Sequence, residues 1–278
     1  MSTISKLMVL TGAGFTKNFG GFLSNEMWPR VFNHPAIHEN EKVRDELLKM
    51  TNFEDAYSKV LESDQFDEEE RTAFKDAIEH AYNLLDEEIS RYKPSSPSYF
   101  NLNHMAKLFF LLSEYAGDER ALWFTLNQDL FLERHKNWRI AGAPDFQQEF
   151  YHLPLRNKPN PIHLPSPQIS QAQLEVALTN GVKNYAGPAY IKLHGSYCWK
   201  SWTGEPGMVL GINKEKFIEK EPLLKCYLKV FKKALNRESA KLIIIGYGFR
   251  DAHINRLLLK AIQEHGLNLY IINPRDPE

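Results

Sequence analysis

The residues best suited to bind a phosphorylated ligand follow the first apolar run of the chain. Residues 6–10 predict a buried strand, and directly after it come Thr11 and then Gly12-Ala13-Gly14-Phe15-Thr16. Glycine lets a backbone turn sharply and lets a ligand approach closely, and the free N–H groups at a helix start attract phosphate. The third glycine of a dinucleotide-binding G-x-G-x-x-G would fall at Lys17, so the motif is incomplete and a plain tight turn remains an alternative.

Groups that can move protons or orient hydroxyls follow two other apolar runs. Asn127 and Asp129 come after residues 121–125, and His194 comes after residues 189–193. An imidazole accepts a proton near neutral pH, an amide orients water or a ribose hydroxyl, and a carboxylate stabilises developing positive charge. This set suits cleavage of an N-glycosidic bond, and it suits hydride transfer less specifically. Taken singly, each residue is also explained as an ordinary turn or structural residue.

Five short apolar runs predict strands, and each is followed by residues that a strand does not need. The runs are residues 6–10, 121–125, 189–193, 241–245 and 267–272. Gly246, Tyr247 and Gly248 follow the fourth run, and Asn273 follows the fifth. Helical patterns separate the runs, which favours an open parallel α/β sheet, and such sheets bind ligands outside the carboxyl ends of their strands. We therefore predict a Rossmann-like parallel sheet flanked by helices, with one nucleotide pocket at that edge.

A helical segment separates the first predicted strand from the second. Residues 67–92 carry one apolar stripe at spacings of three and four, and Asp67 with Glu70 predicts a capping box at its start. We predict an inserted helical subdomain over residues 33–118. The main domain would then comprise residues 1–32 and 119–278.

Prolines interrupt the second half of the main domain. Seven of them fall between Gly142 and Pro188, at positions 144, 154, 159, 161, 165, 167 and 188. So many prolines oppose regular structure, so we predict a long insertion over residues 142–188 with a short helix near 172–178.

The composition of the chain gives no support to several classes of function. The net charge of −1 gives no reason to expect broad capture of nucleic acid or anionic lipid. The two cysteines, Cys198 and Cys226, cannot supply a four-thiolate zinc site, and no other metal-ligand cluster is evident. No apolar run is long enough to span a bilayer and no secretory signal is evident, so we expect a cytoplasmic protein.

In order along the chain, these motifs resemble those of the sirtuin-like NAD-consuming proteins, especially the bacterial branch associated with antiphage defence. Residues 12–16 resemble the GAG-x-S loop of that family, with Thr16 for Ser, and residues 125–129 resemble its T-Q-N-x-D motif. Residues 192–195, Lys-Leu-His-Gly, resemble its catalytic H-G. Residues 245–255, Ile-Gly-Tyr-Gly-Phe-Arg-Asp-Ala-His-Ile-Asn, are similar to the defence-branch segment I-G-Y-S-F-x-D-x-H-I-N, and Asn273 fits the final I-N.

The resemblance implies that NAD binds between a Rossmann-like domain and an inserted helical module. It implies a general base at His194 and positioning residues at Asn127 and Asp129, beside the nicotinamide ribose. It also implies that residues 12–16 contact the phosphates, that residues 246–248 border the ligand and that Asn273 contacts the adenosine ribose. Two departures are that Leu126 stands where the family has Gln, and that the zinc-binding cysteines of the deacylases are missing.

The expected function is hydrolysis of NAD to nicotinamide and ADP-ribose by an effector that depletes NAD during phage infection. Such an activity would kill its host if it were uncontrolled, so we expect control by homo-oligomerisation, by a separately encoded sensor or regulatory protein, or by both. The alternatives are an NAD-dependent deacylase or ADP-ribosyltransferase, a non-catalytic module that senses NAD or ADP-ribose, and a simple dehydrogenase. No direct contact with nucleic acid or a membrane and no metal are expected.

Overall fold

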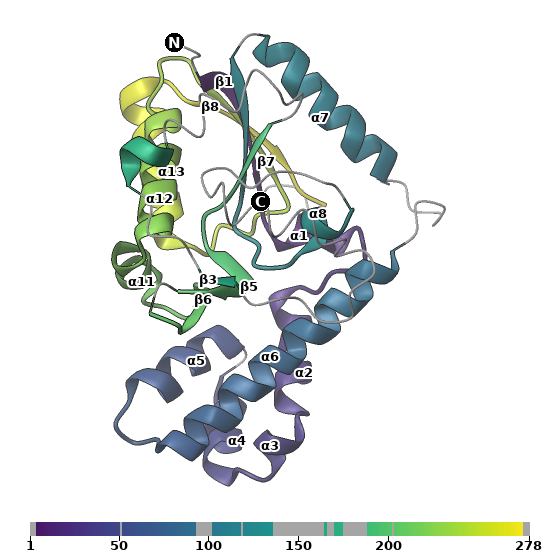
Figure 1. The fold of residues 1–278 in the computed structure, drawn as a ribbon, viewed down its shortest axis with the longest axis vertical. Coiled ribbons are helices and arrows are strands. Elements are labelled where there is room, and N and C mark those ends of the chain that lie inside the picture. The colour runs from purple at the N-terminus through teal and green to yellow at the C-terminus, as the bar shows by residue number, and fades with distance from the viewer. Residues whose placement is uncertain are drawn as a thin grey trace.

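A five-stranded parallel sheet forms the centre of the protein (Figure 1). Its strands lie in the order β4-β2-β1-β7-β8. Their bounds are β1 Ile4–Thr11, β2 Arg120–Thr125, β4 Ala189–Lys192, β7 Lys241–Ile245 and β8 Asn268–Ile272. The structure, a computed structural model, describes residues 4–50, 52–92, 102–117, 119–135, 164–165, 170–174, 188–201 and 203–274. It confirms the predicted Rossmann-like α/β sheet.

The chain builds this sheet outward from β1 in two directions. It adds β2 and β4 on one side of β1, and then returns to add β7 and β8 on the other side. Such a reversal of strand order leaves a crevice at the carboxyl edge of the sheet, which is where ligands bind. The last residues of the strands lie in one row across the sheet: Lys192, Thr125, Thr11, Ile245 and Ile272.

Helices cover the two faces of the sheet (Figure 1). Helix α7, Leu102–Ala116, packs against β1 and β2, whereas α12, Pro222–Leu235, contacts β4 and α13, Ala252–His265. Because it lies between other strands and under helices, β2 is buried along its whole length. Among the helices described, none is both long and apolar enough to cross a membrane.

Five further helices pack together beyond the carboxyl edge of the sheet (Figure 1). They are α2 Ser24–Phe32, α3 Pro35–His38, α4 Glu41–Leu48, α5 Phe53–Glu62 and α6 Glu68–Arg91. The predicted capping box of α6 is present, because Asp67 Oδ1 accepts from the Glu70 backbone N–H at 2.9 Å and Glu70 Oε2 accepts from the Asp67 N–H at 2.7 Å. The division of the chain at residues 33 and 118 stays a prediction, since α2 packs against α6 and α7 packs on the sheet.

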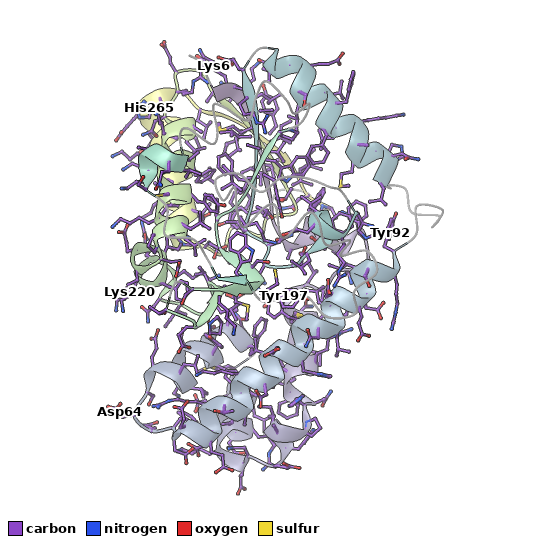
Figure 2. The ribbon with its side chains drawn as sticks, viewed as in Figure 1. Lys6, Asp64, Tyr92, Tyr197, Lys220 and His265 are labelled. Atoms are coloured by element: carbon purple, nitrogen blue, oxygen red, sulfur yellow. The ribbon has the colours of Figure 1, made fainter. Side chains whose placement is uncertain are left out.

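A small second sheet follows β4 directly. Gly195, with φ +68, turns the chain into β5, Gly195–Lys200, which pairs with β6, Pro206–Met208, and with β3, Leu164–Pro165. Tyr197 of β5 stacks with Tyr82 of α6 at a centroid distance of 5.6 Å, where the small sheet meets the helices (Figure 2). We predicted no strand at 195–200. Most of the predicted proline-rich insertion, residues 142–188, lies outside the described residues.

A buried ion pair joins the helical layer to the sheet. Arg134 lies in α8, Phe131–His135, and its Nε donates to Asp86 Oδ1 of α6 at 2.6 Å while a second N–H donates to Oδ2. The two side chains are 3% and 4% exposed. Such a two-point bond fixes both distance and orientation, so it holds α6 against the segment that follows β2.

Glycines bring the turns after β1 and β7 into direct contact. A side chain at Gly12 would place its Cβ 2.7 Å from the Gly246 carbonyl oxygen, and one at Gly14 would lie 2.8 Å from the Gly246 Cα. Gly246 itself has φ +64, and a Cβ there would overlap the backbone nitrogen of Phe15. The point where the strand order reverses is therefore closed by backbone packed on backbone.

We expect Gly246→Ala to lower the free energy of unfolding by about 2–4 kcal/mol, because it adds both a left-handed backbone penalty and an overlap. Gly248→Ala is the matched control, since nothing lies within 4 Å of its added Cβ. The control should change stability by less than about 0.5 kcal/mol. Urea unfolding measures both; equal midpoints for the two variants would contradict the described packing.

We expect Asp86→Ala to destabilise the protein by about 3–5 kcal/mol, because it leaves a buried guanidinium without its carboxylate. The adjacent Glu87→Ala is the control, since the Glu87 carboxylate is 53% exposed and pairs with an exposed Arg91. Urea unfolding of both variants tests this, and a loss for Asp86→Ala no larger than for Glu87→Ala would show that the buried pair does not stabilise the fold.

Candidate active site

Backbone hydrogen bonds continue the parallel ladder one residue beyond the strands. They run from Leu193 N to Thr125 O at 2.9 Å, from Leu126 N to Thr11 O at 2.9 Å, from Gly12 N to Ile245 O at 3.0 Å and from Gly246 N to Ile272 O at 3.1 Å. Each residue that we singled out after a strand therefore starts from a fixed position at this edge. All five groups of predicted site residues lie along it.

The glycine turn leads into a short helix, α1, Ala13–Lys17. Ala13 is exposed and Gly14 half-buried, but the Phe15 ring packs into the core against Trp123, with ring centroids 5.6 Å apart. The Gly14 N–H donates to the Gly246 carbonyl at 2.9 Å. The Phe15 N–H donates to the Gly12 carbonyl at 2.9 Å, so both the ring and the backbone N–H of Phe15 hold the turn in place.

Asn127 is held against the glycine turn by both hydrogens of its amide. Its Nδ2 donates to the Gly12 carbonyl at 3.0 Å and to Thr16 Oγ1 at 2.8 Å. The Gly12 carbonyl can only accept, so it fixes which side of the amide faces the turn. The carbonyl oxygen Oδ1 is consequently left as the group that can accept from a hydroxyl or from water.

Asp129 is buried and belongs to the same network. Its Oδ1 accepts from the Phe131 N–H at 3.0 Å, and its carboxylate also accepts from the Thr16 side chain. Burial raises the pKa of the Asp129 carboxyl, although Lys192 and these hydrogen bonds oppose the shift. The Thr16 hydroxyl therefore connects Asn127 to Asp129.

Lys192 supports this loop from β4. Its side chain is fully buried, and Nζ donates to Glu133 Oε1 at 2.8 Å and to the Asp129 backbone carbonyl. A buried ammonium needs such partners, because an unpaired charge in the interior is costly. Lys192 thus fixes the segment that carries Asp129.

His194 follows β4 and is 1% exposed. Its Nε2 is 3.1 Å from Nε2 of His253 in the first turn of α13, and its ring is also hydrogen-bonded to the backbone of Leu126. Burial lowers the pKa of the His194 ring to about 3, so the ring is neutral at physiological pH. A neutral imidazole is the form that can accept a proton.

The segment after β7 borders the same edge. The Tyr247 hydroxyl donates to Asn255 Oδ1 at 2.9 Å, which orders this turn, while Gly248 is exposed. Asn273 follows β8, and its Nδ2 lies 3.4 Å from the Tyr247 carbonyl. Gly248 and Asn273 are both exposed, so they are accessible to a ligand at this edge of the sheet.

Three residues that our site prediction omitted lie beside His194. The Lys214 ammonium of α11, Lys214–Lys220, is 2.8 Å from Glu54 of α5 and 2.7 Å from Asp251. One donor atom each from Asp251, His253 and His194 lie within 4.8 Å of one another. Asp251 occupies the N-cap position of α13, but its side chain makes no capping hydrogen bond and pairs with Lys214 instead. Asp251 and His253 both lie in the segment 245–255 that resembles the defence-branch motif, and that likeness was the sequence signal for them.

The site residues fall into two linked groups. One contains the glycine turn, Asn127 and Asp129, and the other contains His194, His253 and Asp251. Leu126 and Asn127 are consecutive residues, and they link the two groups. The backbone of Leu126 is hydrogen-bonded to the ring of His194, and the side chain of Asn127 donates to the Gly12 carbonyl. Near a sugar–phosphate ligand, the set supplies a small-residue turn, an orienting amide oxygen and a neutral base.

A separate pocket of about 270 Å³ lies between α5, α6 and the small sheet. Its lining includes Tyr57, Ile78 and Trp199 but none of the residues predicted for NAD.

Comparison with known proteins identifies the family. Residues 122–278 of the 278 match the SIR2-like domain, so the match begins within β2 and leaves the glycine turn outside it. No curated protein matches this chain. SIR2-like domains use NAD, and a match over more than half of the length shows that this chain belongs to the SIR2-like family.

Proposed function

We propose that this protein hydrolyses NAD to nicotinamide and ADP-ribose. One observation carries the proposal: the Asn127 side chain is held against the Gly12 turn and leaves its amide oxygen free. The preceding residue, Leu126, makes a backbone hydrogen bond with His194, so the amide and the imidazole are held by adjacent residues. A base, an orienting acceptor and a phosphate turn are the groups that this reaction needs.

In the proposed reaction the bond from the ribose C1′ to the nicotinamide nitrogen breaks, and nicotinamide leaves as a neutral molecule. Water forms the new bond to C1′ and gives up a proton to the histidine at 194. Asn127 Oδ1 would hold the water or a ribose hydroxyl. The buried carboxyl group of Asp129 would hold Thr16 and thereby Asn127 in place, which makes it a positioning residue.

The rest of the substrate would lie along the carboxyl edge of the sheet. The turn over Gly12, Ala13 and Gly14 would lie beside the phosphates and present the exposed backbone of Ala13 to them, with Thr16 behind it. Tyr247 and Gly248 would border the ligand, and Asn273 would contact the adenosine ribose. The closeness of these groups along one edge supports a single extended ligand, and the proposal requires no metal.

The biological role that we propose is NAD depletion in antiphage defence, by a cytoplasmic enzyme under the control of a partner protein, of oligomerisation, or of both. The likeness of residues 245–255 to the defence-branch segment supports this role. The absence of the four zinc cysteines favours water over an acyl-lysine peptide as the acceptor, because the module that frames the peptide groove of the deacylases is missing.

We expect the purified full chain to release nicotinamide and ADP-ribose from NAD without any acyl-lysine peptide, at a low rate if a partner is required. Asn127→Ala should reduce the rate by at least about 100-fold, because the orienting oxygen is lost. Asn268→Ala, at the opposite end of β8, should retain the wild-type rate. Chromatography of the products measures all three, with unfolding midpoints as a check on folding.

Two results would overturn this assignment. Nicotinamide release that requires an acyl-lysine peptide would make the protein a deacylase or a transferase. Binding of NAD or ADP-ribose that is followed by no cleavage, and that His194→Ala leaves unchanged, would make it a sensing module.

A further inference from the structure

The two histidines at the carboxyl edge of the sheet form one hydrogen-bonded pair. His194 follows β4 and His253 lies in the first turn of α13, and their Nε2 atoms are 3.1 Å apart. His194 is 1% exposed and His253 is 6% exposed, so the contact between the two rings is shielded from solvent. We call the two residues the histidine dyad.

The contact between the two rings requires one Nε2 to donate a hydrogen and the other to accept it, and the tautomers decide which ring is the donor. A backbone hydrogen bond of Leu126 raises the pKa of His194, against the larger effect of burial. The proton transfer described below requires the shared hydrogen on Nε2 of His253. In that tautomer His253 Nδ1 is an acceptor to which the described residues present no hydrogen.

Charged groups surround the dyad from several elements. Those that face His253 are Asp251 at the start of α13, Lys214 and Glu215 of α11, and Arg256 of α13. Burial lowers the pKa of both rings, while the Asp251 carboxylate acts in the opposite direction on each. Among the charged groups, the Asp251 carboxylate has the largest effect on each ring. Its negative charge would therefore stabilise a proton added to the dyad.

The same donor atoms could in principle hold a transition metal, since two imidazoles and a carboxylate are usual ligands. The Lys214 ammonium argues against this use. It lies 2.7 Å from Asp251 Oδ1, so the carboxylate already has a cation, and a divalent ion would have to displace it or lie beside it. The geometry favours proton transfer over metal binding.

We propose that His253 is a second catalytic histidine, through which the attacking water passes its proton to His194. This inference rests on the proposed NAD hydrolysis. As the water oxygen bonds to C1′, its proton moves to His253 Nδ1, and the Nε2–H of His253 moves toward His194 Nε2. The pair gains one proton in total, shared across the Nε2–Nε2 contact beside Asp251, and later releases it to solvent.

The decisive variant is His253→Gln. The glutamine amide keeps an N–H donor near the position of Nε2 but cannot take up a proton, so it separates orientation from transfer. We expect kcat to fall by about 100-fold or more while KM changes little, and the variant combined with His194→Gln to be no slower than the slower single variant, because residues acting as a unit are not additive. His265→Gln, at the far end of α13 (Figure 2), should match wild type.

The pH profile gives a readout that a purely structural role would not change. Because burial lowers the pKa of His253, the neutral dyad persists into mildly acidic solution, so wild-type kcat/KM should fall only below the usual histidine range. The remaining activity of His253→Gln should lose this acid limb, since burial holds the pKa of His194 at about 3. Nitrogen-15 NMR of labelled histidine should show His253 as the Nε2–H form and His194 as the Nδ1–H form.

The outcomes separate the two proposals. A wild-type chain that leaves NAD intact overturns hydrolysis and the relay with it. A wild-type chain that cleaves NAD, together with a His253→Gln variant of equal kcat, overturns the relay alone. Tight binding of added Zn²⁺ that His253→Gln abolishes would also overturn it in favour of a metal site.

Discussion

The continuation of the parallel ladder past the strand ends is the constraint on which the candidate site depends. Four backbone hydrogen bonds hold residues 12, 126, 193 and 246 in register beyond the sheet. Side chains that are far apart in the sequence are therefore fixed relative to one another before any of them touches a ligand. The glycines at 12, 14 and 246 serve the same constraint, because only backbone without Cβ atoms fits where the two turns meet.

Buried ion pairs support the loops that carry the site residues. Lys192 lies two residues before His194, and its ammonium fixes Glu133 and the Asp129 carbonyl, so one short segment of β4 supports both groups of site residues. Arg134 extends this support to α6 through Asp86. The helices beyond the sheet are thus coupled to the loop that carries Asn127 and Asp129. An arrangement of this kind keeps a polar site ordered in a region where each unpaired group would be costly.

Sequence patterns predicted the elements better than the contacts between them. The five apolar runs and the capping box at Asp67 are local features, and the structure confirms them. Strand β5 was not predicted, because it begins with a turn-forming Gly195 and a polar Ser196 and its apolar stretch is short. The core position of Phe15 and the pairing of Asp251 with Lys214 were also missed, since each depends on a residue more than thirty positions away in the sequence.

The substitution at Leu126 shows which property of that position the site uses. The family has Gln here, yet in this chain the side chain is apolar and only 6% exposed. The backbone of the same residue provides the connections, because its N–H donates to the Thr11 carbonyl and its backbone hydrogen bond raises the pKa of His194. Replacing the side chain leaves both bonds intact, whereas any change in the path of the backbone would move His194 and Asn127 together. The protein can therefore differ from its family at this residue and still keep the base and the amide in register.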